Sequence, residues 1–255
     1  MSVDLRGIGV LITRPAAQAQ RVAHSIRAAA GEPLLFPTIE IVAPDNPLAA
    51  RQILATLENF DWAIFISANA VEKTFSLLGL SVWPEKLAVA AIGAATAEAL
   101  HGYNVKNIVS PKNSFDSEAL LALPEFQSIK NSRIVIFRGL GGRETLKQTL
   151  TQRGAGVIYC ESYRRIKPAA PTAPLHQWLE QKKIQAIDVM SGESLANLLE
   201  LAGDSASRLK TIPLITHHPR VAQIAQNRGF TRVTPCAPGD EALMAILESL
   251  SLGKL

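Results

Sequence analysis

Short apolar runs alternate with longer amphipathic segments along the whole chain. The runs are rich in β-branched and aliphatic residues and predict strands, while the segments between them carry apolar residues at helical spacing. Strands that alternate with helices are typical of parallel sheets covered on both faces, so the pattern predicts the α/β class. The predicted strands span residues 8–13, 33–36, 62–66, 87–92, 106–109, 133–138, 157–160, 186–190, 213–216 and 232–234.

The second half of the chain repeats this pattern at a nearly constant offset. Arg14 and Arg138 each end an apolar run and are 124 positions apart, and Ser67 and Ser191 have the same separation. The stretch "DSEALLAL" is followed 123 positions later by "GDEALMAI". Matches in one order and at one spacing predict two similar doubly wound, flavodoxin-like parallel sheets.

Two matching stretches look extended without resembling buried parallel strands. They are "FPTIEIVAP" (residues 36–44) and "CESYRRIKP" (residues 160–168), and both end in Pro. We interpret residues 37–41 and 163–167 as a two-stranded connector that the chain crosses twice. One domain then combines residues 1–36 and 168–255, the other spans 42–162, and a cleft is expected between them. A tandem division near residue 126 is the alternative.

Small, hydroxylic and cationic residues follow the predicted strands. Ligands of open parallel sheets bind beyond the carboxyl ends of the strands, where the following helix N-termini favour anions. We therefore predict a site for a ligand with several carboxylates or phosphates. An alternative is that the Ser and Asn side chains only cap helices and the Arg side chains only pair with surface acids. The predicted binding residues are Arg14, Ser67, Ala68, Asn69, Gly93, Thr96, Arg138, Gly139, Ser191, Gly192, Thr216 and Arg220.

The glycine-rich stretch "RGLGGRE" (residues 138–144) resembles a nucleotide-binding loop only in part. Gly139 and Gly141 match the first two glycines of the dinucleotide fingerprint, but Glu144 stands where the third is needed. The phosphate-binding loop that ends in Gly-Lys-Ser/Thr is also missing. We interpret the stretch as a cradle for an anion rather than as a nucleotide site.

Composition and charge argue against several classes of function. The 255 residues carry a net charge of +4, and Lys and Arg form no long run, which argues against a nucleic-acid binder and suits an anionic small molecule. The two cysteines, Cys160 and Cys236, lack metal-binding spacing and are typical of a reduced, cytoplasmic chain without a metal site. No apolar stretch reaches the roughly 18 residues of a membrane span, and the opening lacks the pattern of a signal peptide.

Several short motifs, in order, resemble the uroporphyrinogen-III synthase family over almost the entire chain. They are "LITRP", "FISANAV", "AAIGAATAEAL", "ESYRR" and the small-residue loop before "GDEAL". The resemblance implies two α/β domains joined by a pair of extended connectors. It also implies a cofactor-free lyase of tetrapyrrole (haem) biosynthesis; separately, the sequence leaves the oligomeric state open, with a monomer expected. Such an enzyme cyclises hydroxymethylbilane with loss of water and inversion of the terminal pyrrole ring.

The resemblance also implies roles for individual residues. Tyr163 in "ESYRR" would be the general acid, because a phenol stays protonated at neutral pH and can donate toward a departing hydroxyl; the alternative is that it only packs between domains. Ser67, Thr96, Ser191 and Thr216 resemble family positions that line the cleft, whereas His217 departs from the family pattern. The enzyme that supplies the substrate, hydroxymethylbilane synthase, is an expected transient partner, and no nucleic acid or membrane is expected.

Other functional classes fit the chain less well. A non-catalytic two-domain protein that binds an anionic small molecule is the main alternative. A glycosyltransferase would need a nucleotide-binding acidic residue, which the sequence does not show clearly. A nucleic-acid module would need more aromatic residues than the three Tyr and three Trp present.

Overall fold

The computed structural model describes residues 3–78, 83–112, 116–169 and 171–254. Contacts divide the chain into two compact units. Unit 1 combines Met1–Glu40 with Ile166–Leu255, and unit 2 is the continuous segment Ile41–Arg165. Unit 1 is therefore made from both ends of the chain, and each unit is described by itself below.

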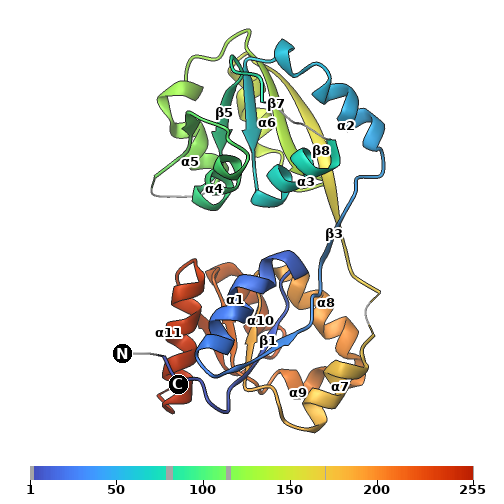
Figure 1. Cartoon of the computed structure of the whole chain (residues 1–255), viewed down its shortest axis with the longest axis vertical. Coiled ribbons are helices and arrows are strands. Elements are labelled where there is room, and N and C mark those ends of the chain that lie inside the picture. Colours follow the sequence, from blue (N-terminus) through green and yellow to red (C-terminus); the bar gives the residue numbers. More distant parts are fainter. Residues whose placement is uncertain (1–2, 79–82, 113–115, 170, 255) are drawn as a thin grey trace. The chain divides into compact units, whose positions relative to one another are not determined.

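Unit 1 contains a five-stranded sheet whose strands pair in parallel (Figure 1). Its spatial order is β2-β1-β9-β10-β11. Counted within the unit, this order is 2-1-3-4-5, that of flavodoxin-like doubly wound folds. The strands are β1 (Gly9–Ile12), β2 (Glu32–Leu35), β9 (Ala186–Asp188), β10 (Leu214–Thr216) and β11 (Val233–Pro235).

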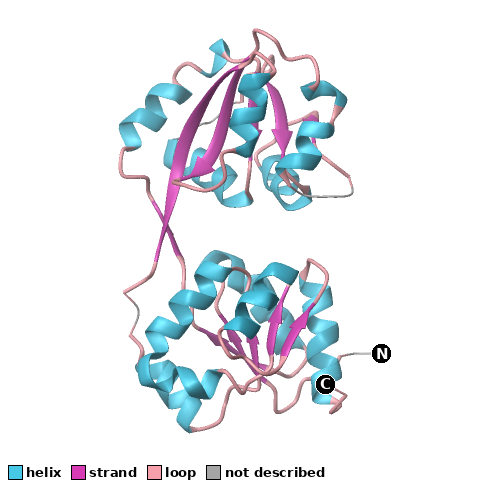
Figure 2. Ribbon diagram, turned by 180° about the vertical axis from the view of Figure 1, so that it is seen from behind, coloured by secondary structure: helices cyan, strands magenta, loops and turns pink. Residues whose placement is uncertain are grey.

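Helices cover both faces of this sheet, as Figure 2 shows. Val10 and Ile12 of β1 pack in one cluster with side chains of α1 and α11, whereas Leu11 packs in another with α7, α8 and α10. This alternation follows from the two-residue period of a strand. The helices are α1 (Ala16–Ala28), α7 (Ala173–Glu180), α8 (Gly192–Ala202), α9 (Ala206–Leu209), α10 (Pro219–Asn227) and α11 (Asp240–Ser251), with the 3-10 turn η3 (Gly203–Ser205).

Unit 2 contains a six-stranded sheet in the order β3-β8-β7-β4-β5-β6. Apart from the edge strand β3, the order matches unit 1 strand by strand: β8, β7, β4, β5 and β6 correspond to β2, β1, β9, β10 and β11. The predicted α/β class with parallel sheets is confirmed. The strands are β3 (Glu40–Val42), β4 (Trp62–Phe65), β5 (Ala88–Ala91), β6 (Ile108–Val109), β7 (Arg133–Gly139) and β8 (Gly156–Ile166).

The core of unit 2 is also divided between the two faces of its sheet. Phe65 and Phe137 stack at 4.4 Å and pack with residues of α2, α3 and α4, whereas Ile64 and Ile136 pack with α5 and α6. None of the helices in the described ranges has both the length and the apolarity needed to cross a bilayer. The helices are α2 (Pro47–Leu54), α3 (Ala68–Leu78), α4 (Ala94–Gly102), α5 (Ser117–Ala122) and α6 (Thr145–Gln152), with the 3-10 turns η1 (Leu57–Asn59) and η2 (Pro124–Phe126).

The strand predicted at 157–160 is longer in the structure. β8 continues to Ile166 and pairs in parallel with β7 as far as Tyr163, so residues 163–166 of the interpreted connector are part of this strand. Cys160 and Tyr163 belong to the buried core of unit 2. A register shift next to Gly139 interrupts the alternation of buried and exposed positions along the strand. The residues of "ESYRR" are mostly polar, so they do not show the apolar pattern that predicts a buried strand.

Candidate active site

The predicted binding residues gather in two groups, one at the carboxyl edge of each sheet. In unit 2 they follow β4, β5 and β7 and begin α3 and α4; in unit 1 they follow β1, β9 and β10 and begin α8 and α10. The unit 2 group is Ser67, Ala68, Asn69, Gly93, Thr96, Arg138 and Gly139, and the unit 1 group is Arg14, Ser191, Gly192, Thr216 and Arg220.

A pocket of about 270 Å³ lies at the carboxyl edge of unit 2. It brings together the end of β7, the glycine loop, the end of β8 and the start of α5. Three of its side chains, Arg138, Arg143 and Arg165, are cationic. The pocket therefore contains Tyr163, the predicted acid, together with cationic side chains of the same unit.

The phenol of Tyr163 is held in a fixed orientation inside this pocket. Its side chain is 3% exposed, and its oxygen lies 3.1 Å from Oγ of Ser67. Ser67 Oγ also accepts a hydrogen bond from the N–H of Ala70 at 3.1 Å, so Ser67 caps α3 as well as contacting the phenol. A Cβ added to Gly139 would lie 2.6 Å from the Tyr163 ring. Glycine is thus required at position 139 for the ring to pack there.

Arg138 is not directed toward solvent. Its side chain is 2% exposed, and its guanidinium donates to Glu144 at 2.9 Å and to the carbonyl oxygens of Gly139 and Gly141. Gly141 and Gly142 adopt φ values of +76° and +107°, which only glycine adopts readily. The glycine loop is therefore folded around the chain's own guanidinium. Binding of an anion by this loop stays a prediction, and the Arg138 charge is already matched by Glu144.

Tyr159 stands beside this pair and is protonated at physiological pH. Its hydroxyl donates to Glu144 Oε2 at 2.8 Å, and the Arg138 guanidinium lies 4.2 Å from its ring centroid. Burial, together with the Glu144 carboxylate, raises the pKa of Tyr159 to about 12. The hydrogen bonds from Tyr159 and Arg138 lower the pKa of Glu144. Glu144 is therefore an anion that orients both neighbours.

In unit 1, Arg14 pairs with two acids, one of them buried rather than at the surface. Its Nε donates to Asp188 at 2.5 Å and its Nη1 to Asp240 at 2.7 Å. Asp240 also accepts from Arg21 at 2.8 Å, so two cations face two anions. The Asp188 side chain is fully buried and that of Arg14 is 7% exposed. These bonds use three of the five N–H groups of Arg14, and a direct contact between Arg14 and a substrate stays a prediction.

The remaining residues of unit 1 surround the starts of α8 and α10. Ser191 caps α8, because its Oγ accepts from the N–H of Ser194 at 3.0 Å. Thr216 is fully buried and His217 is 6% exposed. Thr216 Oγ1 and His217 Nε2 find no hydrogen-bond partner among the described residues. His217, which departs from the family pattern, directly follows β10 and lies in the same group as the predicted residues.

The burial of His217 predicts that acid destabilises unit 1. Burial lowers the pKa of His217, although Asp188 and Asp240 oppose the shift while Arg14 and His218 reinforce it. An unfolded His titrates near 6.5. As the pH falls below that value, the unfolded chain binds a proton before the folded chain does, and stability decreases. We expect Tm to fall more between pH 7.5 and 5.5 in the wild type than in His217→Gln, measured by thermal unfolding. Equal falls would contradict this.

Some residues that line the pocket were not among the site residues predicted from the sequence. Arg165 lies two positions after Tyr163 on β8, and side chains two apart on a strand point to the same face. This relation holds only once the strand is known to continue past residue 160, which the sequence did not indicate. Arg143 reaches the pocket through the fold of the glycine loop, which no local pattern reveals, and Tyr159 reaches it from β8. Within the described ranges, no three His, Cys, Asp or Glu side chains gather as a metal site would require.

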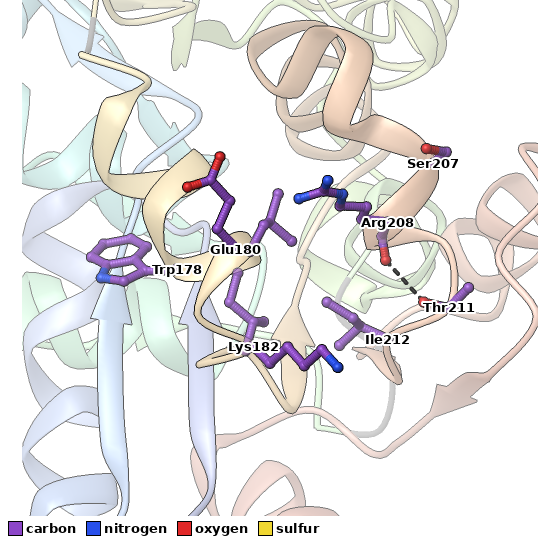
Figure 3. Close-up of a pocket in the computed structure, with 9 residues that line it drawn as sticks. Trp178, Glu180, Lys182, Ser207, Arg208, Thr211 and Ile212 are labelled. Atoms are coloured by element: carbon purple, nitrogen blue, oxygen red, sulfur yellow. Dashed lines mark hydrogen bonds between the residues drawn. The ribbon is translucent and has the colours of Figure 1, made fainter.

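A larger pocket of about 640 Å³ lies elsewhere in unit 1 (Figure 3). Lys182 and Ile184 precede β9, and Thr211 and Ile212 precede β10, so this pocket is at the amino ends of the strands. The Thr211 hydroxyl donates to the carbonyl of Arg208 at 3.0 Å, as the dashed line shows. Because ligands of such sheets bind at the carboxyl ends, size alone does not assign the active site to this pocket.

Comparison with known proteins gives consistent matches. The family model "Uroporphyrinogen-III synthase HemD" matches residues 20–245. The chain is 34% identical over 245 residues to the uroporphyrinogen-III synthase of Salmonella typhimurium and 31% identical over 245 residues to that of Escherichia coli. Each match covers 94% of this chain and 100% of the relative. A mutant uroporphyrinogen III synthase from Thermus thermophilus shares the fold, with a TM-score of 0.64 and 16% identity over 97% of this chain and 100% of that one.

Proposed function

The chain belongs to the uroporphyrinogen-III synthase family, and from this premise we propose that it converts hydroxymethylbilane into uroporphyrinogen III. The substrate is a linear tetrapyrrole with acetate and propionate arms. The reaction releases water, inverts the terminal ring through a spiro intermediate and closes the macrocycle. The observation that carries the proposal beyond the family is the phenol of Tyr163, oriented by Ser67 in a pocket at the carboxyl edge of unit 2.

Tyr163 donates the proton that releases water. Ser67 Oγ accepts from the N–H of Ala70, so its own hydrogen is available for the Tyr163 oxygen. The phenolic hydrogen is then available for the substrate hydroxyl. As the C–O bond breaks, the hydroxyl takes this proton and leaves as water, and the pyrrole nitrogen lone pair stabilises the cation. The proton lost at ring closure returns to the phenolate oxygen.

The size of the pocket limits which part of the substrate it holds. At about 270 Å³ it is smaller than the usual range for a whole ligand. We assign it to the terminal ring, where the bonds change. Arg143 and Arg165 at the pocket attract the arms of that ring, and amide N–H groups at the starts of α3 and α4 face the same edge. Because the pyrrole itself expels the hydroxyl, positioning supplies much of the rate.

The other predicted contacts belong to the same proposal. Arg14, Ser191, Gly192, Thr216 and Arg220 offer a second set of groups for the remaining arms. We also propose that the enzyme works in the cytoplasm as a monomer without a cofactor, and that it receives the unstable bilane by transient contact with hydroxymethylbilane synthase.

The direct test is an isomer analysis. Purified protein is incubated with freshly made hydroxymethylbilane, the products are oxidised, and the porphyrin isomers are separated by chromatography. We expect isomer III to dominate. A sample without protein reports the uncatalysed closure, which gives isomer I. A product dominated by isomer I in the presence of the protein would reject the proposed function.

A further inference from the structure

The pocket of about 640 Å³ in unit 1 is on the opposite edge of the sheet from the predicted binding residues, and it reaches the core of the unit. Leu179 and Ile184 line the pocket and belong to the buried cluster on one face of the sheet. Trp178 and Ile212 line it as well and pack against the same cluster. An apolar wall and a volume of this size are typical of pockets that hold a small organic molecule.

Three charged side chains complete the lining of this pocket. Glu180 is the last residue of α7, Lys182 follows that helix, and Arg208 is on α9. All three are exposed, and none forms an ion pair within the part of the chain that the structure describes. Figure 3 shows Arg208 directed toward α7 and Lys182 directed toward Ile212. Two unpaired cations and one acid leave a net positive charge beside the apolar wall.

The backbone at Lys182 is one that glycine adopts more readily than lysine. Its φ is +54°, and it stands directly after the C-cap of α7, where glycine is the common residue. Besides glycines, the described residues with positive φ are one Ala, three Asn and this Lys, and Asn tolerates the left-handed region better than Lys does. Glycine at position 182 would therefore remove the cation without harm to the end of the helix.

We propose that this pocket binds an organic anion with a flat aromatic body and a single acid group. The body packs against the apolar wall, where the indole of Trp178 and the planar guanidinium of Arg208 both favour contact with a ring. Lys182 and Arg208 attract the acid group, whereas Glu180 repels a second one. The ligand therefore differs from the polycarboxylate bilane, and the inference does not depend on the proposed function.

The test uses two dyes that differ in one charge. Anilinonaphthalene sulfonate has an aromatic body and one sulfonate, and phenylnaphthylamine has the same rings without the sulfonate. Both are titrated by fluorescence against the folded full chain. We expect Lys182→Gln and Arg208→Gln each to raise the Kd of the sulfonate about threefold or more, and the double variant about tenfold or more, because each loses one exposed attractive charge. The Kd of the uncharged dye should stay the same in all of them.

The neighbouring lysine is the matched control. Lys183 is exposed and does not line the pocket, so Lys183→Gln removes the same charge one position away and should leave the Kd of the sulfonate unchanged. Lys182→Gly separates binding from folding. It should weaken the binding of the sulfonate as Lys182→Gln does, and it should unfold at the same temperature as the wild type or higher.

Trp178 reports where the dye is bound. The chain has three Trp residues, and Trp178 is the one that belongs to unit 1. Trp178→Phe keeps an aromatic wall but removes the indole as an energy donor. We expect the emission of the bound sulfonate on excitation of tryptophan to fall strongly in this variant, with little change in its Kd.

Three results would each overturn the site. The first is a wild type that does not bind the sulfonate. The second is an equal Kd for the sulfonate in the wild type and in the double variant of Lys182 and Arg208, or a Kd that rises as much in Lys183→Gln as in Lys182→Gln. The third is unchanged energy transfer in Trp178→Phe, which would place the dye elsewhere on the protein.

Discussion

Replacement of Tyr163 by Phe is expected to slow the turnover of hydroxymethylbilane by about 10- to 1000-fold, within or a little below the range of general acid catalysis. The variant keeps the ring that packs against Gly139 and loses only the hydroxyl that contacts Ser67 at 3.1 Å. Substrate binding should therefore change little, so the loss should appear in kcat rather than in KM. The measurement is a coupled assay at saturating bilane, with the products resolved as isomers.

The chain offers a matched control for this substitution. Tyr103 is exposed and stacks on Phe75 in unit 2, away from the pocket residues. Tyr103→Phe removes the same atom and should leave kcat unchanged. If Tyr163→Phe turns over at the wild-type rate as well, Tyr163 packs the core of unit 2 and does not donate the proton.

Replacement of Asp188 by Ala is expected to lower the free energy of unfolding of unit 1 by about 3–5 kcal/mol. The Asp188 side chain is fully buried, and it takes the Nε and Nη2 donors of Arg14. Its removal leaves a buried guanidinium with one partner, Asp240, instead of two. Hydrogen exchange of the β1 and β9 amides measures the effect in unit 1 alone, which is needed because two compact units need not unfold in one transition.

An exposed pair of the same chemistry is the control. Asp4 pairs with Arg6 at 2.5 Å in unit 1, and the two side chains are 49% and 80% exposed. Exposed pairs contribute little to stability because water and salt screen the charges, so Asp4→Ala should have a small effect. Similar losses in Asp4→Ala and Asp188→Ala would show that burial does not govern the contribution of the Arg14 pair.

Most strands could be predicted from the sequence because strands buried on both faces consist of consecutive apolar residues. The run predicted at 133–138 is β7 (Arg133–Gly139), and that at 62–66 is β4 (Trp62–Phe65). The continuation of β8 to Ile166 could not be predicted in the same way. Its polar side chains and the register shift at Gly139 remove the two-residue period on which such a prediction depends.

The candidate site was predicted as a set of positions but not as a set of contacts. Tyr163 and Ser67 were each singled out, yet their 3.1 Å contact joins residues 96 positions apart. Asp188 was not singled out, because it ends an apolar strand and its partner Arg14 is 174 positions away. Local patterns indicate which side chains face the carboxyl edge. Only the sheet order determines which of them meet, and so which cations are already neutralised.

The strand order of the two units has a consequence for the origin of the chain. Unit 1 takes β1 and β2 from the first repeat and β9, β10 and β11 from the second, while unit 2 takes β7 and β8 from the second and β4, β5 and β6 from the first. Each repeat carries equivalents of all five strands, yet each observed sheet combines strands of both repeats. Two identical copies can complete both sheets by exchanging their last three strands, as in a domain-swapped dimer. Fusing such a pair end to end produces the connectivity of this protein.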